Sequence, residues 1–186
     1  MEVEINNGSK QVPIRKVQED VSIRMDDHVA IEEALLIQLK TRSGLQDLTI
    51  TMRTPGEDED LVVGLLFTEG LIDSSDQIES VVMVDPNCIQ IEFVEDHQPN
   101  LSSTDRNFFS TSACGVCGKS SLDSIAEEPK HKLEPFSPSS SVLLKLYDQL
   151  ASQQSLFSLT GGIHAAALFD EHGEFISMRE DVGRHN

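Results

Sequence analysis

Basic side chains are scarce in this chain of 186 residues. It has 14 lysines and arginines against 32 aspartates and glutamates, which gives a formal net charge of −18 at pH 7. Such an excess of negative charge argues against broad electrostatic binding to nucleic acid or to an anionic membrane, because both carry the same sign of charge. A basic protein partner is compatible with it. We therefore expect no nucleic-acid partner and no membrane partner.

Long apolar runs are missing as well. The longest, residues 61–67, falls far short of the roughly 20 residues that a membrane-spanning helix needs. The first residues lack the basic and apolar pattern of a signal peptide. Because 38% of the residues are apolar, the chain can still build a substantial core. We expect a soluble protein of the cytoplasm.

Cysteine is rare, since the sequence has only Cys88, Cys114 and Cys117. An odd number provides no disulfide framework and favours a reducing compartment, in which the close pair is free to react. Cys88 adjoins the alternating apolar run 89–94, and we expect it to be a small buried strand residue. Glycine adjoins each of the other two cysteines and Lys119 follows them. This stretch predicts an exposed, mobile loop that carries two thiols.

Short alternating patterns predict an α+β arrangement for the first half of the chain. Edge strands are expected within residues 1–30, and hairpins are expected at 33–40 with 48–53, 81–84 with 88–94, and 164–169 with 174–178. Acidic residues 57–60 favour a helix over 61–67 that closes at Gly70, and Ser137-Pro138 opens the clearest helix, to about Gln154. A short helix is expected from Ser120 or Ser121 through Ala126.

The same patterns divide the chain into three parts. Residues 1–107 form an N-terminal α+β domain, residues 108–136 hold the cysteine loop and a connector, and residues 137–186 begin a C-terminal domain. Polar stretches on both sides of the cysteine pair support this division. No internal repeat is visible.

A Cys-x-x-Cys pair has three common chemical uses. Zinc needs about four nitrogen or sulfur ligands, so His131, His164 or His185, or the second pair of a dimer, would have to complete a site. A thioredoxin-type redox pair would open the helix of a βαβ unit, whereas glycines surround both thiols here. A thiolate that carries sulfur needs a lowered pKa, which Lys119 and a helix starting near Ser120 would provide. A loop that merely contains two cysteines is the fourth possibility.

Two further clusters place glycine beside polar side chains. Residues 160–164 read Thr-Gly-Gly-Ile-His, and residues 181–186 read Asp-Val-Gly-Arg-His-Asn. Either could bind an anion or the edge of a base, and a following helix N-terminus would add backbone donors. Either could equally be a turn or a capped helix start. Arg53, at a strand end, is similarly open to interpretation as a solvated turn.

Five segments together carry a resemblance, because they occur in the order seen in the formate dehydrogenase accessory sulfurtransferases, the FdhD family. The segments are residues 52–56, 64–70, 112–119, 160–166 and 180–186. Residues 1–30 contribute nothing to this resemblance.

The resemblance implies a sulfurtransferase that takes persulfide sulfur from a cysteine desulfurase. The sulfur would pass to the molybdenum or tungsten bis(pterin guanine dinucleotide) cofactor of formate dehydrogenase. It also implies a homodimer and a C-terminal part that resembles the cytidine deaminase-like α/β fold. A guanine nucleotide would mimic the bound cofactor, and no resident metal is implied.

Carried over by residue, the resemblance makes Cys114 and Cys117 the catalytic sulfur carriers. The residues assigned to cofactor binding are Arg53, Thr160, Gly161, Gly162, His164, Asp181, Gly183, Arg184, His185 and Asn186. Asp181 would accept hydrogen bonds from the N1 and N2 donors of guanine. A cofactor-binding chaperone without sulfur transfer and a structural zinc protein are the alternatives.

One departure from the family pattern concerns the end of the sequence. Family members continue past the final Gly-Arg-His-Asn with a helix and more sheet, so the C-terminal part as given would be an incomplete layer. Deamination does not follow from the implied fold, because zinc deaminases place a His-x-Glu before their Cys-x-x-Cys, and here the cysteine pair precedes His164.

Overall fold

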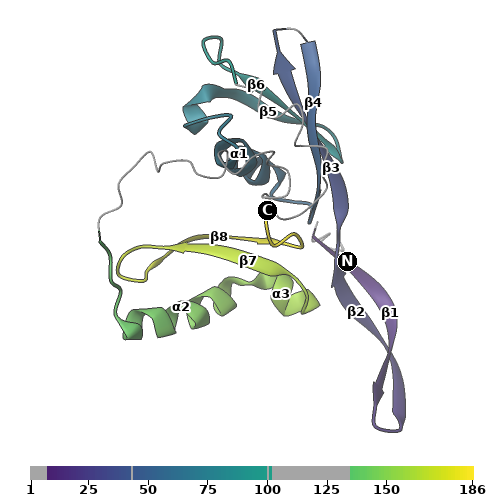
Figure 1. Cartoon of the computed structure of the whole chain (residues 1–186). Helices are drawn as coiled ribbons and strands as arrows, with labels where there is room; N and C mark the ends of the chain where they lie inside the picture. The colour runs from purple at the N-terminus through teal and green to yellow at the C-terminus, as the bar shows by residue number, and fades with distance from the viewer. Residues whose placement is uncertain (1–7, 43, 100, 102–134) are drawn as a thin grey trace, which may run out of the picture. The chain divides into compact units, whose positions relative to one another are not determined.

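The computed structural model describes residues 8–42, 44–99, 101 and 135–186. These residues form two compact units, which we describe separately. Unit 1 comprises residues 8–32, 54–56 and 135–184, and unit 2 comprises residues 33–42, 44–53, 57–99, 101, 185 and 186. Figure 1 shows the elements of both along the chain. Each unit is assembled from segments that are distant in the sequence.

Unit 2 contains a four-stranded sheet and one α-helix (Figure 1). The strands are β3 (Glu33–Thr41), β4 (Gly44–Arg53), β5 (Ile78–Asp85) and β6 (Cys88–Phe93), in the order β4-β3-β6-β5. Strands β3 and β6 are parallel, whereas the other neighbours are antiparallel. Helix α1 (Asp58–Thr68) and the short 3-10 helix η1 (Ser75–Gln77) lie between β4 and β5 in the sequence.

Helix α1 follows the acidic stretch that the sequence singles out. Three acidic side chains occupy its first turn, where negative charge interacts favourably with the helix dipole. The helix ends at Thr68, and Gly70, with φ +70°, takes the left-handed conformation that often closes a helix. Val62 and Leu66 lie one turn apart and are both buried, so a single face of α1 turns inward.

The core of unit 2 lies between α1 and one face of the sheet. Because successive strand side chains point to opposite faces, every second residue of β3 points inward. The buried apolar side chains are Leu35, Ile37, Leu39, Leu48, Val62, Leu66, Leu71, Ile72, Ile89 and Ile91. On the opposite face, Gln38 donates to Asp47 and Lys40 pairs with Glu92. Burial of each aliphatic side chain stabilises the fold by about 1.5–3 kcal/mol. A shift of one residue in the strand pairing would move these side chains to the other face of the sheet, so their burial fixes the register of the strands.

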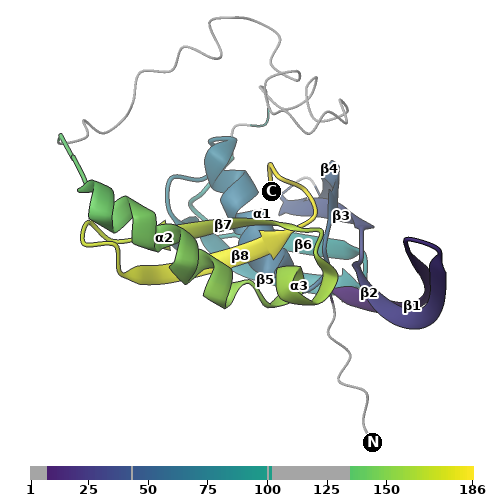
Figure 2. The ribbon, with the colours of Figure 1, turned by 90° about the horizontal axis from the view of Figure 1, so that it is seen from below.

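Unit 1 contains two antiparallel hairpins and two helices. Strand β1 (Ser9–Gln18) pairs with β2 (Val21–Ala30), and β7 (His164–Phe169) pairs with β8 (Phe175–Asp181). Helix α2 (Ser140–Gln153) contacts β8, and helix α3 (Ser155–Thr160) contacts β2. Figure 2 shows α2 lying along the β7–β8 hairpin. The proline in β1 is tolerated because both strands of a two-stranded hairpin are edge strands.

Helix α2 packs against the turn that joins β7 and β8. Ser139 caps the helix by accepting a hydrogen bond from Val142 N at 3.3 Å. Gln149 Nε2 donates to the Gly173 carbonyl at 3.0 Å. Gly173 has φ +81°, and an added Cβ would lie 2.6 Å from Val142 Cγ1, so the turn requires glycine both for its backbone angle and for its contact with α2. None of the helices in the described ranges combines the length and the apolar character that crossing a membrane requires.

The mixed α+β architecture confirms the predicted fold class at this level, and the hairpins and two longer helices lie where the patterns place them. Helix α2 begins at Ser140 rather than at Ser137. Helix α3 was not predicted, and the helix expected over residues 120–126 lies outside the described residues. The predicted three-part division stays a prediction, because residues 102–134 are not described. That β1 and β2 belong with the C-terminal elements in unit 1 was not anticipated.

Two glycines give opposite stability predictions. An added Cβ at Gly8 would lie 2.8 Å from Leu156 Cδ1 and 2.9 Å from Thr54 Cγ2, whereas at Gly64, inside α1, it would meet no atom of the described residues within 4 Å. Gly8→Ala should lower the free energy of unfolding by about 1–3 kcal/mol through overpacking. Gly64→Ala should raise it by about 0.5–1 kcal/mol, because alanine is the better helix former. Urea unfolding followed by circular dichroism measures both, and a Gly8→Ala protein as stable as the unmodified chain would contradict the packing.

Candidate functional site

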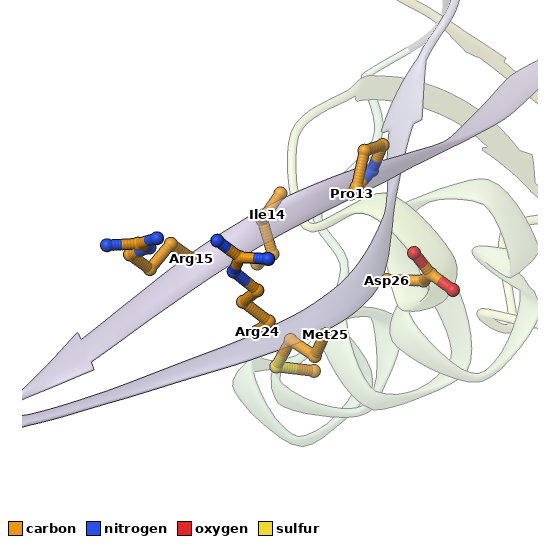
Figure 3. Close-up of a pocket in the computed structure, with 6 residues that line it drawn as sticks. All are labelled: Pro13, Ile14, Arg15, Arg24, Met25 and Asp26. Carbon is orange, nitrogen blue, oxygen red and sulfur yellow. The ribbon is translucent and has the colours of Figure 1, made fainter.

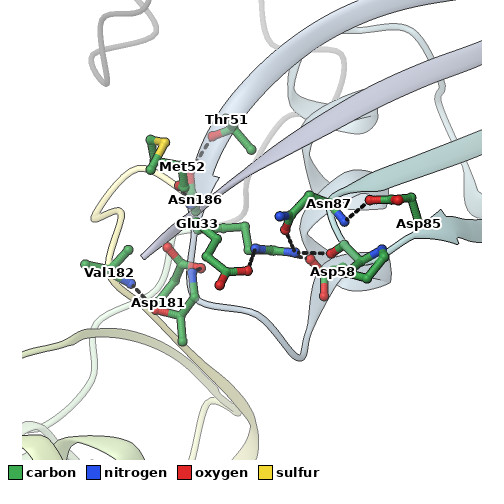
Figure 4. A network of polar contacts seen from close by, with 12 residues as sticks. Glu33, Thr51, Met52, Asp58, Asp85, Asn87, Asp181, Val182 and Asn186 are labelled. Atoms are coloured by element: carbon green, nitrogen blue, oxygen red, sulfur yellow. Dashed lines mark hydrogen bonds and ion pairs between the residues drawn. The ribbon is translucent and has the colours of Figure 1, made fainter. Parts of the chain in front are cut away.

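Two consecutive carboxylates at the end of β8 organise unit 1. Asp181 Oδ2 accepts a hydrogen bond from Thr54 N at 3.0 Å, and Asp181 Oδ1 accepts one from Gly183 N at 2.6 Å. Val182 N in turn donates to Thr54 Oγ1 at 3.1 Å. Asp181 and Val182 are labelled in Figure 4. These bonds hold Thr54 against the residues that follow β8.

Glu180, the neighbouring carboxylate, binds helix α3. Its Oε2 accepts from Leu156 N at 2.9 Å and its Oε1 accepts from Phe157 N at 2.8 Å. The first N–H groups of a helix have no partner inside the helix, and α3 has no side-chain cap of its own. Glu180 therefore caps α3 from β8, a contact that sequence spacing gives no means of finding.

The Thr160-Gly161-Gly162 segment begins where α3 ends. Gly161 closes the helix with φ +67°, and its N–H donates to the Phe157 carbonyl at 2.7 Å. Thr160 Oγ1 donates to the Leu156 carbonyl at 2.7 Å and accepts from Gly162 N at 3.4 Å. Both the backbone and the threonine side chain thus fix this loop to the preceding helical turn.

Antiparallel pairing brings the two glycine-containing clusters to one end of the β7–β8 hairpin. His164, the first residue of β7, lies opposite Asp181, the last residue of β8. The Thr160-Gly161-Gly162 loop immediately precedes β7, and Gly183 and Arg184 closely follow β8. His164 and Arg184 are exposed. Seven of the predicted cofactor-binding residues therefore lie in unit 1, and their role toward a cofactor stays a prediction.

Arg53 has a different setting in unit 2. It is 1% exposed, so the interpretation as a solvated turn was wrong. Its Nε forms an ion pair with Asp58 Oδ1 at 2.5 Å, and Nη2 donates to the Pro86 carbonyl at 2.9 Å and to Asn87 Oδ1 at 3.3 Å (Figure 4). Nη1 lies 3.7 Å from Glu33 Oε2. The guanidinium links α1 and the β5–β6 turn to the end of β4. Its contact with a cofactor stays a prediction.

The last two residues also belong to unit 2. Asn186 Nδ2 donates to the Met52 carbonyl at 2.8 Å, and Thr51 Oγ1 donates to Asn186 Oδ1 at 3.4 Å (Figure 4). The asparagine side chain is thereby bound to β4, whereas His185 is exposed. The role of these two residues as cofactor ligands stays a prediction.

The predicted sulfur carriers Cys114 and Cys117 lie outside the described residues. Cys88 is half-buried in β6 rather than fully buried, and its thiol donates to Gln38 Oε1 at 3.4 Å. Burial raises the pKa of the Cys88 thiol, and the negative charges of Asp85 and Asp47 raise it further. The thiolate form of Cys88 is therefore less favoured than that of an ordinary cysteine. Within the described ranges, no three His, Cys, Asp or Glu side chains gather as metal ligands would.

A cavity of about 460 Å³ opens on the β1–β2 hairpin (Figure 3). Its lining residues are Pro13, Ile14, Arg15, Arg24, Met25 and Asp26. Arg15 and Arg24 occupy opposite positions in the two strands. No residue that the sequence assigned to a site lines this cavity, so the candidate site is the end of the β7–β8 hairpin.

Comparison with solved structures first defines the class of fold. A crystal structure of a proposed formate dehydrogenase accessory protein from Desulfotalea psychrophila matches 95% of this chain with a TM-score of 0.68, at 20% sequence identity, and 64% of that protein is covered. The chain therefore has the fold of the part of that protein that it matches. The cytidine deaminase-like detail of the C-terminal part is not confirmed by this match.

Comparison of sequences gives the family. The model of the FdhD/NarQ family matches residues 30–186, and the chain belongs to this family. It is 39% identical to the sulfur carrier protein FdhD of Picrophilus torridus over 86% of this chain, and 39% identical to that of Sulfolobus acidocaldarius over 95% of it. The chain spans 60% and 65% of the length of these two relatives.

The environment of Cys88 predicts slow alkylation. With a raised pKa, a smaller fraction of the thiol is thiolate at neutral pH, and only the thiolate reacts. In the folded protein, iodoacetamide should modify Cys88 more slowly than in urea-unfolded protein, and the difference should shrink as the pH rises above 9. Peptide mass spectrometry measures the rates, with Cys88→Ala to confirm the assignment of the peptide. Equal rates in the folded and unfolded states at neutral pH would contradict the raised pKa.

Proposed function

We propose that this protein is a sulfurtransferase that carries persulfide sulfur from a cysteine desulfurase to the molybdenum or tungsten bis(pterin guanine dinucleotide) cofactor of formate dehydrogenase. The observation that carries the proposal is the Cys114-Gly-Val-Cys117 pair in a member of the FdhD/NarQ family whose relatives are named sulfur carrier proteins. The cytoplasm as compartment, a homodimer and a cytidine deaminase-like C-terminal part belong to the same proposal.

The transfer step balances without any oxidant. The thiolate of Cys114 attacks the terminal sulfur of the donor's persulfide, a new sulfur–sulfur bond forms, and the donor cysteine leaves as a thiolate. Lys119, two positions after Cys117, is a cation in the sequence that would favour the thiolate form. Cys88 is the less suitable carrier, because its thiol has a raised pKa.

The end of the β7–β8 hairpin is the part we assign to the guanine nucleotide portion of the cofactor. Arg184 is exposed there and offers a guanidinium for a phosphate group. Among the described residues, no atom would lie within 4 Å of a Cβ added at Gly162, so these residues leave its backbone open to a close ligand. Arg53, His185 and Asn186 of unit 2 stay proposed cofactor residues, although Arg53 and Asn186 already bond within that unit.

Desulfurase labelling tests the sulfur carrier. Incubation with a cysteine desulfurase and cysteine should add about 32 mass units per sulfur to the peptide that holds Cys114 and Cys117, because a thiolate accepts sulfane sulfur. Cys114→Ala should abolish most of the label, and Cys88→Ala, the matched control, should leave it unchanged. If the double alanine variant at 114 and 117 still activates formate dehydrogenase, the protein is a cofactor-binding chaperone. Stoichiometric zinc that is lost with Cys114→Ser would instead make it a structural zinc protein.

Gly162→Ala tests the nucleotide site without disturbing the fold. Since an added Cβ meets no described residue and the backbone angle is not left-handed, the variant should unfold at the same urea concentration as the unmodified chain. If phosphates approach this backbone, GDP should bind at least about tenfold more weakly, a loss of about 1.4 kcal/mol. Calorimetry measures the affinities, with Gly64→Ala as the control glycine. Unchanged GDP affinity in Gly162→Ala would move the site elsewhere.

A further inference from the structure

We propose that Glu180 and Asp181 are positioning residues, which hold the loops of the candidate site on the two sides of β8 and do not themselves read the nucleotide base. The inference rests on the proposed function in one respect, since it takes the Thr160-Gly161-Gly162 loop to be a nucleotide-binding segment. Because consecutive residues of a strand point to opposite faces, the two carboxylates serve different loops.

Glu180 acts on the Thr160-Gly161-Gly162 loop indirectly, through hydrogen bonds of one turn of α3. The peptide unit between Leu156 and Phe157 donates its N–H to Glu180 Oε1 at 2.8 Å, and its carbonyl accepts from Thr160 Oγ1 at 2.7 Å. The next carbonyl, that of Phe157, accepts from Gly161 N at 2.7 Å. Hydrogen bonds arranged in such a chain polarise and strengthen one another. The carboxylate therefore fixes both the side chain of Thr160 and the backbone of Gly161.

Helix α3 cannot hold this geometry unaided. It has six residues, and the side chain of its own N-cap residue Gln154 makes no capping hydrogen bond, whereas isolated helices need roughly 12–15 residues to be even marginally stable in water. Both oxygens of Glu180 are used, one on each of two successive backbone N–H groups. Glutamine at this position would keep one acceptor and turn an NH₂ group toward the other N–H. The substitution should loosen the turn while leaving the size of the side chain unchanged.

Asp181 is engaged in the same way on the other face of β8. Each of its oxygens already accepts from a backbone N–H, Oδ2 from Thr54 and Oδ1 from Gly183. A guanine base presents its N1 and N2 donors side by side, so reading the base would require both oxygens to turn toward one edge. The observed bonds instead direct the two oxygens to two different chain segments. Asp181 thus places Thr54 and the Gly183 backbone, and the ligand meets other groups.

The test combines hydrogen exchange with nucleotide affinity in the full chain. Glu180→Gln should speed amide exchange at Leu156, Phe157 and Gly161, and Asp181→Asn should speed it at Thr54 and Gly183. Each variant should weaken GDP and ADP by the same factor, about tenfold, so that the ratio of the two affinities is retained. Glu174→Gln is the matched control, because it removes one exposed carboxylate from the residue that precedes β8.

Two results would overturn the inference. One is unchanged exchange at these amides in the two variants, whatever the nucleotide affinities are. The other is an Asp181→Asn protein that loses affinity for GDP but not for ADP, which would make Asp181 a reader of the base. A chain that binds neither nucleotide would remove the proposed nucleotide site, and the exchange measurement would still decide the positioning role.

A second pair of variants covers the case in which Glu180→Gln does not fold. Thr160→Val removes the hydroxyl that bonds to the Leu156 carbonyl and keeps Glu180, and Thr160→Ser restores the hydroxyl. The valine variant should show faster exchange at Gly161 and Gly162 together with weaker binding of both nucleotides, and the serine variant should recover both. Recovery of neither property would contradict a connection that runs through this hydroxyl.

Discussion

A buried guanidinium is the constraint on which unit 2 depends. Arg53 is 1% exposed, and removing one partner of a buried pair typically costs about 3–5 kcal/mol, because it leaves the other charge uncompensated. Its partners come from different elements, namely Asp58 in the first turn of α1 and the Pro86 carbonyl in the β5–β6 turn. The apolar core attaches α1 to the sheet but does not fix the orientation of the helix, since hydrophobic burial is non-directional. Arg53 restricts that orientation, because its planar set of N–H donors fits few arrangements of acceptors.

Much of this fold could be predicted because it follows from periodicity. Leu35, Ile37 and Leu39 occupy every second position of β3. All three are buried, and the residues between them are half-exposed. The acidic run before α1 and the glycine after it mark that helix for reasons that act within one turn. Such signals are local, so they can be recognised without knowledge of the tertiary structure. The grouping of β1 and β2 with the C-terminal elements is not local, and the sequence gives no sign of it.

The site shows the same division between local and distant causes. The role of Gly161 can be predicted from the sequence, since a left-handed helix end favours glycine. Helix α3 cannot be predicted in this way, because it is short and takes its cap from Glu180, a residue far along the chain. Arg53 was open to interpretation as an exposed turn residue, because the carbonyl of Pro86 and the amide of Asn87 that satisfy it lie in a distant turn. Hydrogen bonds between distant segments have no periodicity, and only the fold reveals them.

These hydrogen bonds divide the motif residues into two groups, namely side chains that already bond to the protein backbone and side chains that remain exposed to solvent. Glu180, Asp181 and Thr160 use their side-chain oxygens on backbone groups of the protein. By contrast, the side chains of His164 and Arg184 are exposed and make no hydrogen bond or ion pair with another described residue. A ligand gains most from groups that lose no existing partner when it arrives, because a bond exchanged for another contributes little net free energy. The exposed imidazole and guanidinium, with the open backbone at Gly162, are therefore the groups best suited to touch a ligand, and the engaged carboxylates are suited to keep them in place.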